Sequence, residues 1–207
     1  MGDDWQRIQD ALRAAGVEGV EDFGRFVNDT HHFEPSQFDE RAAMPVLLSV
    51  LPTLEDPRAV DAVAMHLRRP WARPTAFEPL HTAFLRWAPE HATAAGWHLG
   101  DALGTTATAE HVPVLLALAE DTTFGASRQM IVFQLARFKA RPEVCAAVER
   151  LVNDPDVALH AMSALRKCLG NEAALPVLQV VEASHPDPRV RKQAAQAIKK
   201  ATKASAR

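Results

Sequence analysis

The sequence lacks any apolar run that approaches the roughly 20 residues needed for a transmembrane helix. It has only two cysteines, Cys145 and Cys168, and each lies in an apolar helical pattern that favours a buried thiol over a disulfide or a metal site. The start, MGDDWQ, is acidic where a signal peptide is basic, and Gln6 stands where a myristoylation signal has Ser or Thr. We therefore expect a cytoplasmic protein that does not enter a membrane.

Motifs that would fix a chemistry are also missing. The sequence has no Gly-rich phosphate-binding loop and no clear Ser-His-Asp or Cys-His arrangement. What remains is the composition of a folded protein, with 47% hydrophobic and 24% charged residues. We expect neither a cofactor nor a resident metal.

Charge is unevenly distributed along the chain. The formal net charge is -3, yet residues 185–207 hold seven Lys or Arg against the single Asp187, and residues 1–40 hold ten Asp or Glu against three Arg. Such polarity can steer an encounter or favour head-to-tail contacts, although two solvated ends are the simpler explanation. We expect a monomer.

What the sequence does contain is a repeat. Five segments with a similar residue pattern begin 32, 36, 30 and 33 residues apart, and this spacing is typical of stacked supersecondary units. The copies are DPRAVDAVAMHL from Asp56, APEHATAAGWHL from Ala88, FGASRQMIVFQL from Phe124, DPDVALHAMSAL from Asp154 and DPRVRKQAAQAI from Asp187.

Each position of the repeat has a physical role. Asp before Pro predicts a helix start. The Asp carboxylate accepts hydrogen bonds from first-turn amides that have no partner within the helix, and proline has no amide hydrogen to leave unpaired at the first helical position. Apolar residues four apart predict a buried stripe, and Arg128 falls in register with Arg191. The stripe residues expected to be buried are Val60, Ala64, Val157, Ala161, Leu165, Val190, Ala194 and Ile198.

A second helix is predicted before each of these, marked by a proline near its start. The prolines are Pro45, Pro79, Pro113, Pro142 and Pro176. The five helix pairs resemble the short HEAT-like repeats also found in phycobilin lyases. The resemblance implies an all-α, right-handed α-solenoid of about five HEAT-like helix pairs with an N-terminal helical cap.

The same resemblance sets the expected domain organisation, which is one structural domain overall because each unit contacts its neighbours. Residues 3–30 read as two helices of the cap. The expected segments are a cap at 1–37, repeats over 38–201 (about 38–70, 75–104, 108–139, 141–170 and 171–201) and a basic tail at 202–207.

In such a solenoid the second helices line a concave surface, and the tenth position of each unit points into it. These positions are Met65, Trp97, Phe133, Ser163 and Gln196, followed four residues later by Arg69, Asp101, Arg137, Lys167 and Lys200. With Arg68, Arg166 and Lys199 they predict a basic stripe that is flanked by two aromatic rings and broken by one acid. The candidate binding residues are Met65, Arg69, Trp97, Asp101, Phe133, Arg137, Lys167 and Lys200.

No metal site is predicted. HEAT-like deoxyhypusine hydroxylases hold two irons through His-Glu dipeptides, whereas this sequence offers only the reverse order in Glu90-His91 and Glu110-His111. His91 and His98 lie two helical turns apart, too far for one metal without a third ligand. A bilin lyase would need a pigment pocket, and none can be identified from the sequence.

The sequence therefore predicts a non-enzymatic interaction module that binds a protein or another extended partner on its concave face. The alternative is a DNA-binding protein, because cations and aromatic rings are the ingredients of nucleic-acid binding. Trp97 and Asp101 also resemble the Trp and Asp of HEAT-like alkylpurine DNA glycosylases, which implies a catalytic Asp101 in that alternative. The sequence pI of about 6.3 argues against it.

Overall fold

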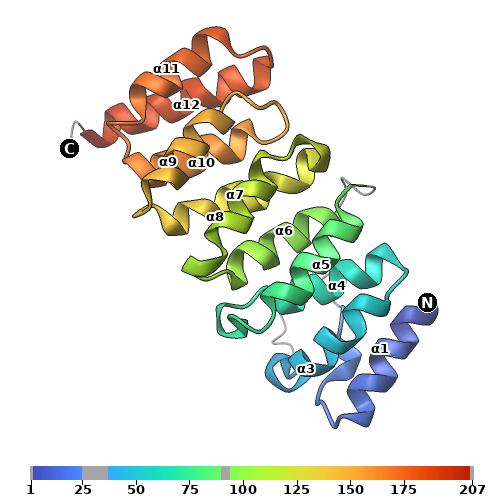
Figure 1. Ribbon diagram of the computed structural model, residues 1–207. Coiled ribbons are helices and arrows are strands. Elements are labelled where there is room, and N and C mark those ends of the chain that lie inside the picture. The colour runs from blue at the N-terminus through green and yellow to red at the C-terminus, as the bar shows by residue number, and fades with distance from the viewer. Residues whose placement is uncertain (1, 25–36, 90–93, 206–207) are drawn as a thin grey trace. The chain divides into compact units, whose positions relative to one another are not determined.

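The computed structural model describes residues 2–24, 37–89 and 94–205, and within these ranges the chain is entirely helical, without a strand (Figure 1). The predicted all-α class is therefore confirmed for the described part of the chain. The chain divides into two compact units, Met1–Ala107 and Thr108–Arg207. We call them unit 1 and unit 2.

Unit 1 begins with an amphipathic helix and continues with two helix pairs. In the first pair the helices are connected through a 3-10 turn, and residues 90–93, between the helices of the second pair, lie outside the described residues. The helices are α1 (Asp3–Ala14), α3 (Glu40–Val50), α4 (Pro57–Leu67), α5 (Phe77–Trp87) and α6 (Ala94–Thr106), and the 3-10 turns are η1 (Val20–Asp22), η2 (Leu51–Thr53) and η3 (Pro70–Ala72).

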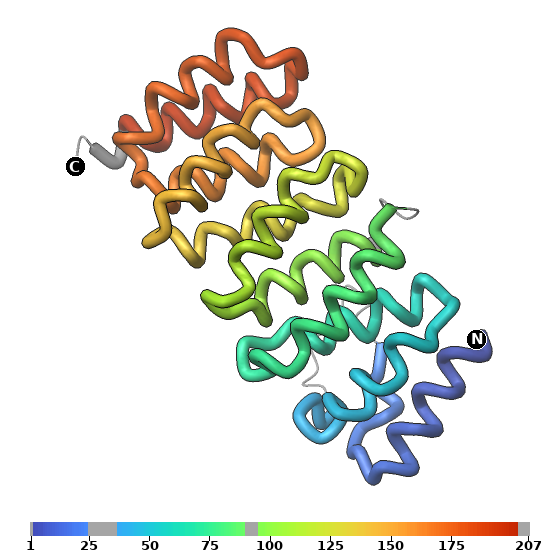
Figure 2. The backbone as a smooth tube through the Cα atoms, in the orientation of Figure 1, coloured from blue at the N-terminus to red at the C-terminus, as the bar shows by residue number. Residues whose placement is uncertain are grey.

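Unit 2 contains three helix pairs, through which the backbone runs back and forth (Figure 2). Its helices are α7 (Val112–Glu120), α8 (Gln129–Leu135), α9 (Pro142–Leu151), α10 (Ala158–Leu169), α11 (Leu175–Ser184) and α12 (Pro188–Ser205), and its 3-10 turns are η4 (Ala109–His111), η5 (Thr122–Arg128) and η6 (Ala136–Phe138).

The second helices of the pairs pack against one another within each unit. In unit 1, α4 contacts α6, α3 packs on α4, and α1 packs on α3. In unit 2, α10 lies between α8 and α12, while α7, α9 and α11 pair with α8, α10 and α12 in turn. We call α8, α10 and α12 the inner row of unit 2, and α7, α9 and α11 its outer row.

The Asp-Pro signals start two helices as predicted. The carboxylate of Asp56 accepts a hydrogen bond from the amide of Arg58 at 2.8 Å, and that of Asp187 accepts one from Arg189 at 2.7 Å. Each proline then occupies the first helical position, where the missing amide hydrogen does no harm.

The third Asp-Pro signal behaves differently. Helix α10 begins at Ala158 instead of directly after Asp154, and residues 155–157 form a turn. The carboxylate of Asp154 accepts from the guanidinium of Arg128 at 2.8 and 3.2 Å as well as from the amide of Asp156. The expected helix start is therefore wrong by one turn, although Asp154 makes the same cap hydrogen bond, to the amide two residues on, as Asp56 and Asp187.

Arg128 is completely buried, and its guanidinium also donates to the carbonyl oxygens of Ala119 and Gly125 at 3.0 Å each. Arg191, in register with it, donates to the carbonyls of His185 and Pro186 in the same way. In both repeats an arginine satisfies backbone oxygens that the preceding helix and loop leave open. Arg128 also contacts the following repeat, through its ion pair with Asp154.

The predicted buried stripe is observed at all positions but one. Ile198 is half-buried, because it lies in the last helix of the described chain, where no further helix covers it. The positions that are buried are Val60, Ala64, Val157, Ala161, Leu165, Val190 and Ala194.

The N-terminal region is described in part. Helix α1 confirms the first of the two helices predicted for the cap, and its Trp5 and Leu12 are buried. The second predicted helix is wrong over its described part: only the 3-10 turn η1 forms, because Phe23 is extended and Gly24 has a φ of 75°. Residues 25–36 lie outside the described residues. No helix in the described part of the chain is both long and apolar enough to cross a membrane.

Truncating Leu165 should destabilise the protein strongly. Leu165 is fully buried on α10, so Leu165→Ala removes methyl groups from a packed core and should lower the free energy of unfolding by about 2 to 5 kcal/mol. Leu159→Ala, on the same helix but 43% exposed, is the matched control and should change it by under about 1 kcal/mol. Urea denaturation measures both, and equal effects would contradict the burial pattern.

Replacing Arg128 should also be costly. Arg128→Met leaves the carboxylate of Asp154 without its partner and two carbonyls without donors, so we expect a loss of about 3 kcal/mol in the free energy of unfolding. Arg150→Met is the control, because the Arg150–Glu120 ion pair is exposed and should contribute about 1 kcal/mol or less. A mild Arg128→Met variant would show that this pair does not hold the repeats together.

Candidate binding groove

The eight candidate binding residues divide equally between the two units. Met65, Arg69, Trp97 and Asp101 belong to unit 1, and Phe133, Arg137, Lys167 and Lys200 belong to unit 2. A continuous stripe through both sets stays a prediction. Within each unit, however, the structure shows what each side chain contacts.

In unit 1 the cations of the predicted stripe are neutralised. The guanidinium of Arg68 lies 2.7 Å from the carboxylate of Asp101, and that of Arg69 forms two hydrogen bonds with the carboxylate of Glu40. A guanidinium held in this way presents little charge to a polyanion. These two arginines therefore serve the structure of unit 1.

Asp101 lies well inside α6 and is only 4% exposed. The burial of a carboxylate needs a physical reason. The reason is its partner: Arg68, at the end of α4, brings a positive charge to the carboxylate, which makes burial of the carboxylate tolerable. The negative charge of Asp101 is thus already engaged by a neighbouring helix.

Glu40 is the centre of a polar cluster in unit 1. Besides Arg69, it lies 3.3 Å from Nδ1 of His66, whose buried ring stacks on Phe23 and meets the edge of Phe38. Burial alone would raise the pKa of Glu40, but the hydrogen bonds with His66 and Arg69 outweigh it and hold this pKa at about 2. The cluster joins α3 to the end of α4.

An Asp–His pair is the feature of unit 1 that sequence reasoning missed. Asp61 Oδ1 of α4 lies 2.6 Å from Nδ1 of His98 in α6, and the His98 ring meets the half-buried Trp97 edge to face at 4.9 Å. Asp61 is buried and His98 is half-buried. His98 lies beside the candidate Trp97, but its partner is 37 residues away, so no local spacing could reveal the pair.

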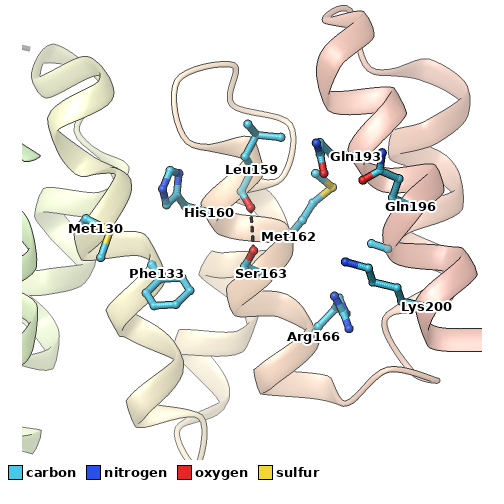
Figure 3. Close-up of a pocket in the computed structure, with 11 residues that line it drawn as sticks. Met130, Phe133, Leu159, His160, Met162, Ser163, Arg166, Gln193, Gln196 and Lys200 are labelled. Carbon is cyan, nitrogen blue, oxygen red and sulfur yellow. Dashed lines mark hydrogen bonds between the residues drawn. The ribbon is translucent and has the colours of Figure 1, made fainter. Parts of the chain in front are cut away.

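In unit 2 the inner row forms a half-open groove of about 490 Å³ (Figure 3). Phe133 and Lys200 from the candidate set line it, together with two further residues at tenth positions, Ser163 and Gln196. Sequence reasoning missed the neighbours that complete it, because they depend on which helix faces lie together. The missed lining residues include Met130, Leu159, His160, Met162, Gln193 and Ala197.

The cations around this groove are not neutralised by acids. The ammonium of Lys167 lies 3.7 Å from the centroid of the Phe133 ring, and the guanidinium of Arg166 donates to the amide oxygen of Asn171. Within the described part of unit 2, neither these two cations nor Lys200 forms an ion pair. Arg137 does not line the groove; it is exposed on η6, with its guanidinium over Phe138.

The distribution of acids explains this difference. Unit 2 holds 14 Lys or Arg against ten Asp or Glu, a formal net charge of +4, whereas unit 1 holds nine against 16, a net charge of -7. No Asp or Glu occurs in α8, α10 or α12. The acids of unit 2 lie in the outer row and in the loops, so the groove presents a positive surface.

His160 adds a neutral side chain to the groove. Burial lowers its pKa, because a charged imidazolium is poorly solvated there. Its Nδ1 is buried and has no hydrogen-bond partner within the described residues. At neutral pH, His160 therefore contributes no charge, and the positive charge around the groove comes from Arg166, Lys167 and Lys200.

The two cysteines lie close together on α9 and α10, and both are half-buried, less than the sequence predicted. Burial and the adjacent Cys145 raise the pKa of Cys168 to about 12. A thiol that stays protonated at neutral pH is a poor nucleophile. No group of three His, Cys, Asp or Glu within the described ranges is placed to hold a metal ion; Glu90 and His91 lie outside them.

Comparison with known proteins does not add a family: no family model, curated protein or solved structure matches the chain. The residues themselves therefore carry the functional argument. They define a positively charged, partly apolar groove in unit 2 and a set of neutralised charges in unit 1.

The Glu40 cluster should make the stability of the protein depend on acid pH. Because the folded pKa of about 2 is below the ordinary value of 4.5, the stabilisation is fully present above pH 4.5 and is lost as the pH falls from there towards 2. Glu40→Gln should flatten the free energy of unfolding across this range. Glu18→Gln, at an exposed position, is the control and should leave the slope unchanged; identical slopes for all three proteins would contradict the assignment.

Proposed function

We propose that the protein is a non-enzymatic binding module whose unit 2 groove holds an extended segment of another protein. The observation that carries the proposal is the inner row itself. It combines a groove of about 490 Å³, apolar side chains, and cations that have no acid beside them within the described residues. A concave, mostly preformed site with a few polar groups is typical of ligand recognition.

We further propose that the five helix pairs are HEAT-like repeats of a right-handed solenoid. Their order along the chain supports this, as does the contact of second helix with second helix within each unit. Stacked repeats offer a long, rigid surface that suits an extended partner. In that arrangement the groove would be one section of a larger inner face.

The alternative of a DNA-binding protein or an alkylpurine DNA glycosylase-like enzyme has less support. The Phe133 ring is covered on one face by the ammonium of Lys167, which leaves less of it for stacking on a base. Arg68 engages the carboxylate of Asp101, which this alternative needs to face a bound sugar. Among the described residues that line the groove of unit 2, none carries a carboxylate that could take its place.

A peptide selection tests the proposed function. A display library of random 12-residue peptides is selected on the full-length protein, and binding of the enriched peptides is compared with that of a variant whose groove is filled. Ser163→Trp places a large ring in the groove from an exposed position, where the hydroxyl donates to the carbonyl of Leu159. We expect enriched peptides to bind Ser163→Trp at least about tenfold more weakly.

Ser184→Trp is the matched control. Ser184 is also exposed on a helix and bonds to the carbonyl four residues before it, but it lies in the outer row on α11. Binding should survive this change. A selection that enriches no peptides, or peptides that bind Ser163→Trp and wild type equally, would overturn the proposal.

A further inference from the structure

We infer that the groove of unit 2 recognises an acidic, extended segment that carries an apolar side chain about three residues away from an acid. This inference rests on the proposed function, and it adds the chemistry and spacing of the partner. It follows from the way in which the groove is divided. One side of α10 is mainly apolar, and the other is polar and positively charged (Figure 3).

The apolar strip lies between α8 and α10. Met130 and Phe133 contribute to it from α8, and Leu159 contributes from α10, where it is 43% exposed. A leucine this exposed, beside a phenylalanine and a methionine, offers apolar surface that a partner could cover. Methionine suits this use because its flexible, polarizable side chain adapts to different shapes.

The polar strip lies between α10 and α12. Gln193, Gln196 and Lys200 reach it from α12, and Arg166 reaches it from α10 (Figure 3). Two cations that line the same groove without an acid to neutralise them fit a carboxylate. The inner row supplies no acid that could compete for them.

The two glutamines indicate that the segment is extended. Each amide group offers both donors and an acceptor, which match the free backbone groups of an extended peptide. A helical partner has already paired most of these groups within its own backbone. Gln193 and Gln196 would therefore gain little from a helix.

The spacing follows from the distance between neighbouring helices. Packed helices lie about 8 to 10 Å apart, so the centres of the two strips are separated by about that distance. An extended chain in the polyproline II conformation advances about 3.1 Å per residue and completes a turn in three residues, so side chains three residues apart lie on the same side, about 9 Å apart. This places the acid about three residues from the apolar anchor. A segment with both groups at this separation can fill both strips at once.

Nucleic acid meets the same cations but fits the groove less well. It would need flat rings for its bases, whereas the strip between α8 and α10 has two rings only among the described residues: Phe133, which already contacts Lys167, and the half-buried His160. We therefore assign the cations to carboxylates rather than to phosphates.

Designed peptides test the inference by fluorescence anisotropy on the full-length protein. The probe is a 12-residue Gly/Ser peptide with one Leu and one Glu three residues apart. Three comparison peptides replace Glu with Gln, replace Glu with Lys, or separate Leu and Glu by seven residues. We expect the first peptide to bind at least about fivefold more tightly than each of the others, with an affinity that falls as salt is added.

Charge-reversal variants distinguish binding in the groove from a general attraction to the net positive charge of unit 2. Lys200→Glu should lower the affinity for the Glu peptide about tenfold and raise the affinity for the Lys peptide. Lys192→Glu makes the same change of charge on the same helix, at an exposed position that does not line the groove, and should alter neither by more than about twofold. Equal effects of the two variants would overturn the inference.

The outcomes distinguish the inference from the proposed function. If the library selection yields groove-dependent peptides that are neutral or basic, or if the four designed peptides bind alike, the acidic partner is wrong and the binding groove stands. If the selection yields none, the proposed function itself fails. Single-stranded DNA of 12 nucleotides that binds more tightly than the Glu peptide, and loses affinity in Lys200→Glu, would replace the acidic segment with a nucleic acid.

Discussion

A charged group that leaves water needs a partner of opposite sign, and this requirement distinguishes two sets of cations in the protein. Arg68, Arg69 and Arg128 are buried or half-buried, and each is held by a carboxylate from another part of its unit. Lys167 and Lys200 remain exposed near a groove whose helices contain no acid. The first set, all arginines, joins elements within unit 1 and within unit 2. The second set, the two lysines of unit 2, supplies the charge on which the proposed recognition depends.

Arg128 shows how strongly this requirement acts on the fold. Its guanidinium satisfies carbonyls of Ala119 and Gly125 and engages Asp154. The carboxylate that the sequence offers as a helix cap is thereby shared: it still accepts from the amide of Asp156, as the other two caps do from the amide two residues on. A local capping preference contributes about 1 kcal/mol, which is less than the penalty for leaving a buried guanidinium unpaired. At Asp154 one carboxylate meets both demands.

The groove depends on the same packing. Alanines at 161, 164 and 194 are fully buried on α10 and α12, and such small side chains allow neighbouring helices to approach closely. The larger residues, Met130, Phe133 and Leu159, are left to line the opening between the helices. Rigid elements that hold an apolar strip beside a charged one need little rearrangement on binding, which lowers the entropic penalty of association.

The sequence by itself determined the helical class, the buried stripe and the helix starts at Asp56 and Asp187, because caps and apolar periodicity act over a few residues. Register also indicated Phe133, Ser163, Gln196 and Lys200, which line the groove. Only the tertiary structure decided that Asp101 is buried against Arg68, that His98 meets Asp61, and that Met130 and His160 complete the groove. These partners come from helices about 30 residues apart in the chain, and charge pairing at that separation depends on how the helices pack rather than on any local spacing.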